Sequence, residues 1–125
     1  MIQRAQTGST ILAMPAKAMP QRRFPRLKAE HPVFVEVLAE RSGGEFARTR
    51  SIGEGGCSFH SPEGVGYLSL MKVSIALQGK VVTADGRVVY AVREPQGYEV
   101  GVEFLRVSSE DRMHIRSLVA GAAGR

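Results

Sequence analysis

The stretch Met71-Lys72-Val73-Ser74-Ile75-Ala76-Leu77 places an apolar side chain at every second position. A period of two is typical of a β-strand with one face against a core, so the odd-numbered residues of this stretch are predicted to face the interior. On its N-terminal side the same reasoning predicts three more strands, separated by glycine-rich turns, at Val33–Leu38, Glu45–Ile52 and the shorter Cys57–Phe59.

On the C-terminal side, two valine-rich runs, Val81-Val82 and Val88-Val89-Tyr90, flank Asp85-Gly86. Such a pattern fits a two-residue hairpin and also one long strand with a glycine bulge, and the local sequence leaves both open. Glu94-Pro95-Gln96-Gly97 has the composition of a turn, and Tyr98–Leu105 again alternates as a strand does.

The last segment has the features of a helix. Serines and acidic residues at 108–111 suit a helix N-terminus, where side-chain oxygens cap free N–H groups and negative charge is favoured. Ile115, Leu118 and Val119 fall on one face, and Gly121 is expected to end the helix. Five or more strands followed by one helix predict an all-β fold, a small antiparallel barrel with a C-terminal α-helix.

The length of 125 residues suits a single domain. Residues 1–20 contain glycine, prolines and a Ser/Thr cluster without a sustained period, so we expect a flexible N-terminal tail. The barrel domain is expected to span residues 21–120, and residues 121–125 to form a C-terminal tail. One cysteine and the absence of an apolar run near ~20 residues point to a cytoplasmic protein without a membrane helix.

The net charge of +5 is unevenly distributed. Six of the 17 Lys and Arg residues lie within residues 1–28, which contain no Asp or Glu, so the rest of the chain sums to −1. A barrel that binds long RNA or DNA is expected to carry a broad basic stripe on its folded surface. The charge distribution therefore argues against a long nucleic acid as partner.

Residues suited to catalysis are scattered. His31, His60 and His114 lie in different segments without a cysteine or i,i+4 partner, so no metal site is predicted. Cys57 is interpreted as a small apolar core residue, and no two carboxylates form a recognisable acid–base pair. The chain is therefore predicted not to be an enzyme.

Two segments remain as candidate binding elements. Gln21-Arg22-Arg23-Phe24-Pro25-Arg26 gathers cations just before the first predicted strand, and guanidinium groups four residues apart can close on one anion. Arg50-Ser51-Ile52-Gly53-Glu54-Gly55-Gly56 forms a loop whose glycines allow a ligand to approach the backbone. Taken alone, the first can equally be a solvated linker and the second an ordinary connection between strands.

Taken in order along the chain, these motifs resemble the PilZ domain family. That family's pattern is Arg-x-x-x-Arg followed by Asp/Asn-x-Ser-x-x-Gly, here Arg22 to Arg26 and then Ser51 to Gly56. Gly86-Arg87-Val88-Val89-Tyr90, Tyr98–Phe104 and the final helix agree as well, so the resemblance covers about residues 21–119.

The resemblance implies a six-stranded antiparallel PilZ-like β-barrel with a C-terminal α-helix, and it favours the bulge at Asp85-Gly86. It also implies a bacterial receptor that binds cyclic di-GMP without further cofactors. The implied ligand-binding residues are Arg22, Arg23, Arg26, Ser51, Gly53 and Gly56. Such a receptor signals by conformational change to a downstream protein partner, as a monomer or weak homodimer.

Two positions depart from the family's pattern: Ser51 stands for Asp or Asn, and Gly53 stands for Ser. The family uses those side chains to hold a guanine edge, and the loss of their hydrogen bonds weakens binding. The departures leave a second hypothesis open, a PilZ-like protein–protein adaptor that binds cyclic di-GMP weakly or not at all.

Overall fold

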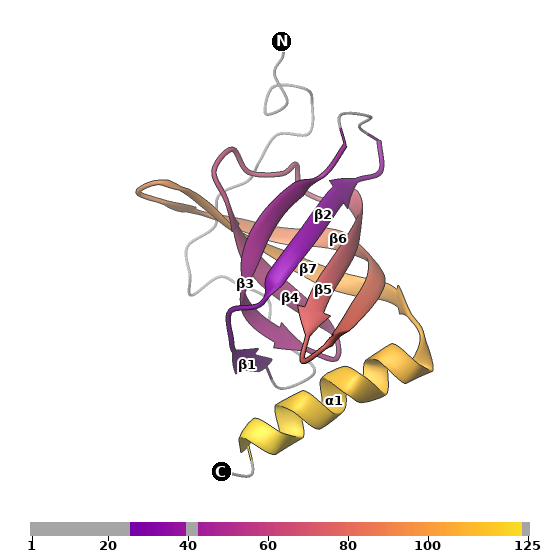
Figure 1. The fold of residues 1–125 in the computed structure, drawn as a ribbon. Coiled ribbons are helices and arrows are strands. Elements are labelled where there is room, and N and C mark those ends of the chain that lie inside the picture. Colours follow the sequence, from indigo (N-terminus) through magenta and orange to yellow (C-terminus); the bar gives the residue numbers. More distant parts are fainter. Residues whose placement is uncertain (1–25, 40–42, 124–125) are drawn as a thin grey trace.

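The computed structural model describes residues 26–39 and 43–123. These residues form seven strands and one helix in chain order (Figure 1): β1 Arg26–Lys28, β2 Pro32–Val37, β3 Glu45–Gly53, β4 Gly56–Ser61, β5 Leu70–Leu77, β6 Lys80–Glu94, β7 Gly97–Val107 and α1 Ser109–Ala123. The predicted flexible tail at residues 1–20 and the arginines at positions 22 and 23 lie outside the described residues.

Six of the strands close into an antiparallel barrel. The order along the sheet is β3-β2-β5-β6-β7-β4, and pairing between β3 and β4 completes the ring. The predicted six-stranded barrel with a C-terminal helix is therefore confirmed. The three-residue β1 was not predicted; it pairs with the end of β3, Arg26 opposite Gly53 and Lys28 opposite Ser51.

The alternating residues of β5 form the centre of the core. Its four odd-numbered residues, Met71 to Leu77, are each 0% exposed, as the two-residue period predicts. Val33 and Val35 of β2 are also buried, and Val37 packs against them while partly exposed. The sheet thus buries one face of every strand around a common interior.

Residues 80–94 form one long strand rather than a hairpin at Asp85-Gly86. β6 pairs with β5 through its first half and with β7 over most of its length, with register shifts between Asp85 and Gly86 and between Val88 and Tyr90. A Cβ atom at Gly86 would lie 2.5 Å from Val102 Cγ1, so the shift is accommodated by glycine. The bulge, which the family resemblance favoured, is confirmed.

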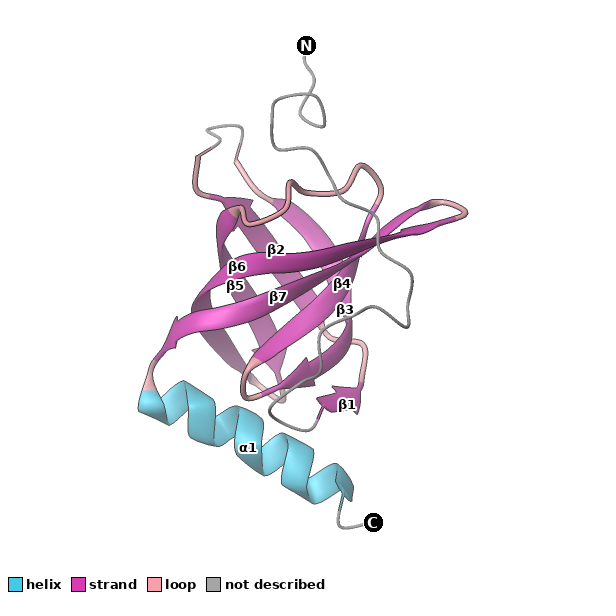
Figure 2. Ribbon diagram, turned by 180° about the vertical axis from the view of Figure 1, so that it is seen from behind, coloured by secondary structure: helices cyan, strands magenta, loops and turns pink. Residues whose placement is uncertain are grey.

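The helix α1 lies across one end of the barrel (Figures 1 and 2). Its N-terminus is capped as predicted, because the Asp111 N–H donates to Ser108 Oγ at 3.0 Å. Ile115 is fully buried, while Leu118 and Val119 pack partly buried against the core.

The prediction that Gly121 ends the helix is wrong, because α1 continues to Ala123. Gly121 is exposed, and a Cβ atom at that position would have no neighbour within 4 Å. A helical glycine costs about 1 kcal/mol relative to alanine, which does not by itself terminate a helix.

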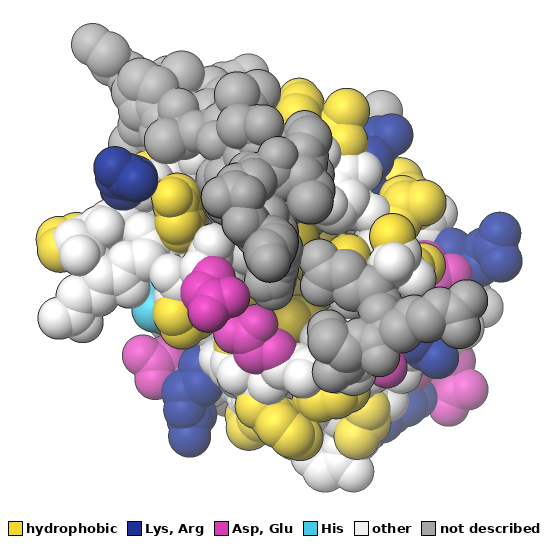
Figure 3. Space-filling view, turned by 90° about the horizontal axis from the view of Figure 1, so that it is seen from above, with side chains coloured by type: hydrophobic (Ala, Val, Ile, Leu, Met, Phe, Trp, Pro, Cys, Tyr) yellow, Lys and Arg dark blue, Asp and Glu magenta, His cyan; other side chains and the backbone are white. Residues whose placement is uncertain are grey.

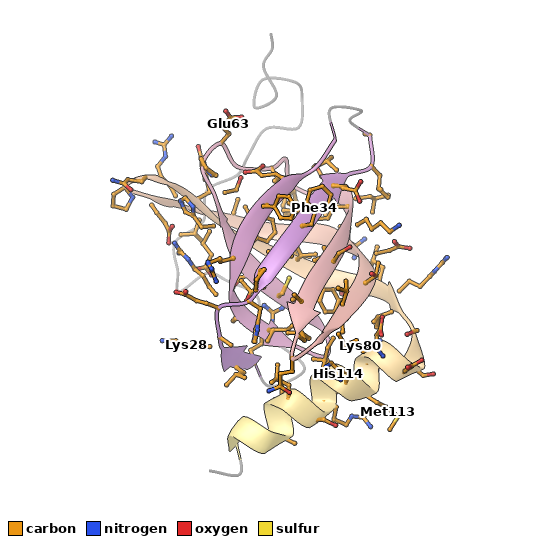
Figure 4. All side chains as sticks on the ribbon, in the orientation of Figure 1. Lys28, Phe34, Glu63, Lys80, Met113 and His114 are labelled. Atoms are coloured by element: carbon orange, nitrogen blue, oxygen red, sulfur yellow. The ribbon has the colours of Figure 1, made fainter. Side chains whose placement is uncertain are left out.

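Polar contacts join the start of α1 to the β5–β6 turn (Figure 4). His114 Nε2–H donates to the Leu77 carbonyl at 2.9 Å, and Lys80 Nζ lies 3.0 Å from a Glu110 carboxylate oxygen. Figure 3 looks onto the opposite end of the barrel and shows apolar side chains among charged ones. Leu38, which follows β2, and Leu70, the first residue of β5, are about half exposed. Within the described residues, no helix is long and apolar enough to cross a bilayer.

Candidate ligand-binding site

Four of the six predicted site residues lie together where β1, β3 and β4 meet. Arg26 of β1 is the register partner of Gly53 in β3, and Gly53 is in turn the partner of Gly56 in β4. Ser51 lies two residues before Gly53 in β3 and therefore points to the same face of the sheet. Arg22 and Arg23 lie outside the described residues, so their placement stays a prediction.

The Arg26 side chain extends over the glycines. Its Nη1 lies 3.4 Å from Ser51 Oγ, and its Nη2 lies 2.7 Å from the point where a Cβ atom at Gly56 would stand. A side chain at position 56 would therefore collide with the guanidinium, and also with the Val102 carbonyl oxygen at 2.0 Å. The absence of a side chain at Gly56 is what lets the Arg26 guanidinium reach across β3 to β4.

Ser51 belongs to a row of small residues on the outer wall of the barrel. Its Oγ lies 2.8 Å from Ser58 Oγ of β4, and both serines are almost fully buried. Ser58 is opposite Gly101 of β7, which is opposite Tyr90 of β6. Residues directly opposite each other in an antiparallel pair point to the same face, so this row crosses four strands of the wall seen in Figure 2.

The Tyr90 ring covers Gly101 in this row. A Cβ atom at Gly101 would lie 2.0 Å from Tyr90 Cε2, so only glycine leaves room for the ring. The Tyr90 hydroxyl donates to Glu99 Oε2 at 2.9 Å, and Arg50 Nη1 lies 3.3 Å from Glu99 Oε1. Arg50 also pairs with Glu94, and these carboxylates raise the pKa of its guanidinium.

A second row runs parallel to the first. Gly53 is opposite Gly56, Gly56 is opposite Glu103 of β7, and Glu103 is opposite Arg87 of β6. Arg87 Nη2 donates to Glu103 Oε1 at 2.9 Å, and both side chains are partly exposed. The two glycines therefore lie between Arg26 on one side and a carboxylate–guanidinium pair on the other.

The turn between β3 and β4 is tied to α1. Arg116 Nε and Nη2 donate to the two Glu54 carboxylate oxygens at 3.1 and 3.0 Å, and Arg112 Nη1 lies 3.4 Å from the Glu54 carbonyl oxygen. The hydrogen bonds from Arg116 lower the pKa of the Glu54 carboxyl. A bidentate pair of this kind fixes orientation as well as charge, so it holds the candidate loop against the helix.

These contacts were not found from the sequence. Glu54 and Arg116 are 62 residues apart, and Glu103 meets Arg87 only through the register of β6 with β7. Strand register was the missing signal, because it decides which of many surface charges become neighbours.

Cys57 lies behind the site, on the inner side of β4. It is 0% exposed, and burial raises the pKa of its thiol to about 12, against a slight opposing effect of the Arg26 charge. We expect the folded protein to resist a thiol-specific disulfide reagent at pH 8 and to react fully once denaturant exposes Cys57. Rapid stoichiometric labelling of the folded chain would contradict this packing.

The residue types at the site suit an anion or a polar ring system rather than a metal. Among the described residues, no group of three or more His, Cys, Asp or Glu side chains is arranged to hold a metal ion.

Beside the site, a groove of about 990 Å³ follows the outer face of β3 as far as the β6–β7 turn, with Arg48, Arg50, His60 and Gln96 among its lining residues.

Comparison with protein-family models shows one match, the PilZ domain, over residues 20–121. No curated protein matches the sequence. The fold is shared with several solved structures at low sequence identity.

Among those structures, the Bacillus subtilis inhibitor of motility MotI/DgrA superposes with a TM-score of 0.71 at 13% identity, covering 90% of this chain and 58% of its own. The PilZ domain of CeSA, from a cellulose-synthesising bacterium, gives 0.56 at 18% identity, over 79% of this chain and 98% of its own. The K. pneumonia MrkH–c-di-GMP complex gives 0.60 at 19% identity, over 84% of this chain and 52% of its own. The chain thus spans little more than half the length of MotI/DgrA and MrkH.

Proposed function

The chain belongs to the PilZ domain family, whose members are cyclic di-GMP effectors rather than enzymes, and we propose from this that it is a non-catalytic receptor for cyclic di-GMP. Its ligand is proposed to bind on the outer wall of the barrel, between Arg26 and the 51–56 loop. Arg22 and Arg23, in the segment that precedes β1, are proposed to contact the same ligand.

The observation that carries the proposal is the position of Arg26, which is opposite Gly53 and has its guanidinium against Gly56. A guanidinium fork matches both a phosphate group and the O6/N7 edge of guanine, the two kinds of acceptor that cyclic di-GMP presents. The two glycines are buried and carry no side chain that would keep a flat ligand away from the guanidinium. The Ser51–Ser58 pair adds hydroxyl donors and acceptors beside it.

Signalling is proposed to pass from the loop to the helix. Glu54 belongs to the loop and accepts hydrogen bonds from Arg116 of α1. A ligand that shifts the loop would therefore also change the position of the helix against the barrel. The downstream partner is proposed to be a protein, met in the bacterial cytoplasm where the messenger acts. The similar structures include an inhibitor of motility and a c-di-GMP-dependent transcription regulatory factor, so this fold serves different downstream processes.

A second function is favoured by one specific observation, the absence of a carboxylate or amide at position 51 and of a hydroxyl at position 53. Under that alternative, the chain is an adaptor that docks on a partner protein without cyclic di-GMP.

Isothermal titration of the full chain with cyclic di-GMP distinguishes the two functions, with guanosine monophosphate as control. We expect micromolar or tighter binding of the cyclic dinucleotide and no detectable heat from the mononucleotide. The absence of heat from a chain whose NMR spectrum shows a folded barrel would favour the adaptor. Binding of long RNA with a steep salt dependence would instead indicate a nucleic-acid-binding barrel.

A further inference from the structure

We infer that Arg87 and Glu103 form the far side of the ligand site, where Glu103 supplies the guanine-reading carboxylate that position 51 lacks. The inference rests on the proposed function and adds two residues, from β6 and β7, to the site.

The first step is placement. Arg26, Gly53, Gly56, Glu103 and Arg87 are successive register partners across five strands. Val102 and Phe104 on either side of Glu103 belong to the core, so the Glu103 side chain points outward, to the face on which Arg26 lies. Neighbouring strands are ~4.8 Å apart, so Glu103 stands one strand beyond the glycine that the Arg26 guanidinium covers.

The second step is hydrogen-bonding capacity. Glu103 and Arg87 have side chains 47% and 41% exposed. Glu103 Oε1 accepts from Arg87, whereas Oε2 has no side-chain partner within the described residues. The Arg87 Nε–H is buried and likewise has no partner among them. The pair therefore keeps one acceptor for a ligand, Oε2 of the half-exposed Glu103, whereas the buried Arg87 Nε–H is out of a ligand's reach.

The third step is chemical matching. The Watson–Crick edge of guanine presents N1–H and N2–H donors, which a carboxylate accepts, while O6 and N7 accept from a guanidinium. A serine hydroxyl at position 51 can both donate and accept, so it distinguishes guanine poorly from adenine. Glu103 can make this distinction, because adenine has no N1–H or N2 amino group.

The other nearby carboxylates are already occupied. Both oxygens of Glu54 are held by Arg116, and Glu99 accepts from Arg50 and Tyr90. Glu103 is the carboxylate of the second row. Gly53 and Gly56 add no side chain to the strip between it and β1, and the Arg26 guanidinium reaches across this strip as far as Gly56.

The test titrates three full-length chains, wild type, Glu103→Gln and Glu110→Gln, with cyclic di-GMP and with cyclic di-AMP. Glu110→Gln is the matched control, because Glu110 is also an exposed carboxylate in an ion pair, with Lys80, but belongs to α1. We expect Glu103→Gln to weaken cyclic di-GMP about 10- to 100-fold, to leave cyclic di-AMP within about twofold, and so to remove the preference for guanine. Glu110→Gln should leave both affinities unchanged.

A second variant separates ligand reading from local packing. Adding Ser51→Asp to Glu103→Gln returns a carboxylate to the opposite side of the strip and should restore the preference for cyclic di-GMP. If Glu103→Gln binds both dinucleotides as the wild type does, Glu103 does not read guanine, and the inference fails while the proposed function stands. If the folded wild type binds neither dinucleotide, the proposed function fails and the inference with it.

Discussion

Replacing Arg26 by alanine is expected to weaken cyclic di-GMP binding by about 100-fold or more and to leave the barrel folded. The guanidinium lies against Gly56, where a bound phosphate or guanine edge would accept two hydrogen bonds from it. Hydrogen bonds to charged groups contribute about 1.5–3 kcal/mol each, and 1.4 kcal/mol corresponds to tenfold in affinity. The measurement is titration calorimetry of the variant beside the wild type.

The control for this variant is Lys28→Ala. Lys28 lies on the same short strand and carries the same charge, but it is exposed and is the register partner of Ser51 rather than of Gly53 (Figure 4). Loss of affinity in Arg26→Ala alone, with both variants unfolding at the wild-type temperature, would assign the effect to the Arg26 contacts. Equal losses in the two variants would mean that only the positive charge of the segment matters.

The barrel was predictable because each of its main strands buries one face. The alternation in residues 71–77 needs no tertiary information, since the pleat itself sends successive side chains to opposite sides. β1 lacked this signal, because three residues cannot establish a period. Its pairing depends on β3, which makes it a tertiary feature rather than a local one.

At the end of α1, a local sequence signal was present but gave the wrong boundary. Gly121 has the residue type of a helix terminus, and the helix nevertheless runs past it to Ala123. Local propensity differs by only about 1 kcal/mol between glycine and alanine. The contacts that Ile115, Leu118 and Val119 make with the barrel hold the preceding turns, so the last residues extend a helix that already exists.

The candidate site was predictable in its motif residues and not in its surroundings. The order of the motifs pointed to Arg26, Ser51, Gly53 and Gly56, which the structure brings together. Arg87 and Glu103 lie within two segments that agree with the family, but nothing in the sequence marked them as site residues, because they become neighbours only once the bulge in β6 has set its register with β7.

The double variant Ser51→Asp with Gly53→Ser is expected to tighten cyclic di-GMP binding by about 10- to 150-fold. It restores the two side chains that the family's pattern places beside the arginines, and hydrogen bonds missing at these positions cost about 1–3 kcal/mol. Ser51 Oγ already lies 3.4 Å from Arg26 Nη1, so a carboxylate at position 51 would form an ion pair with the Arg26 guanidinium. Gly53 is not among the residues with positive φ, so its backbone accepts a serine.

The single variants divide this gain between the two positions. Ser51→Asp should contribute most of it, because the carboxylate can hold both Arg26 and a guanine edge, whereas Gly53→Ser adds one neutral hydrogen bond. Ser58→Ala is the matched control on the neighbouring strand: it removes the hydroxyl that contacts Ser51 Oγ without adding a ligand group, and it should not tighten binding. Unchanged or weaker affinity in the double variant, with the fold intact, would mean that guanine is read elsewhere on this wall. Glu103 is then the residue whose replacement should have the larger effect.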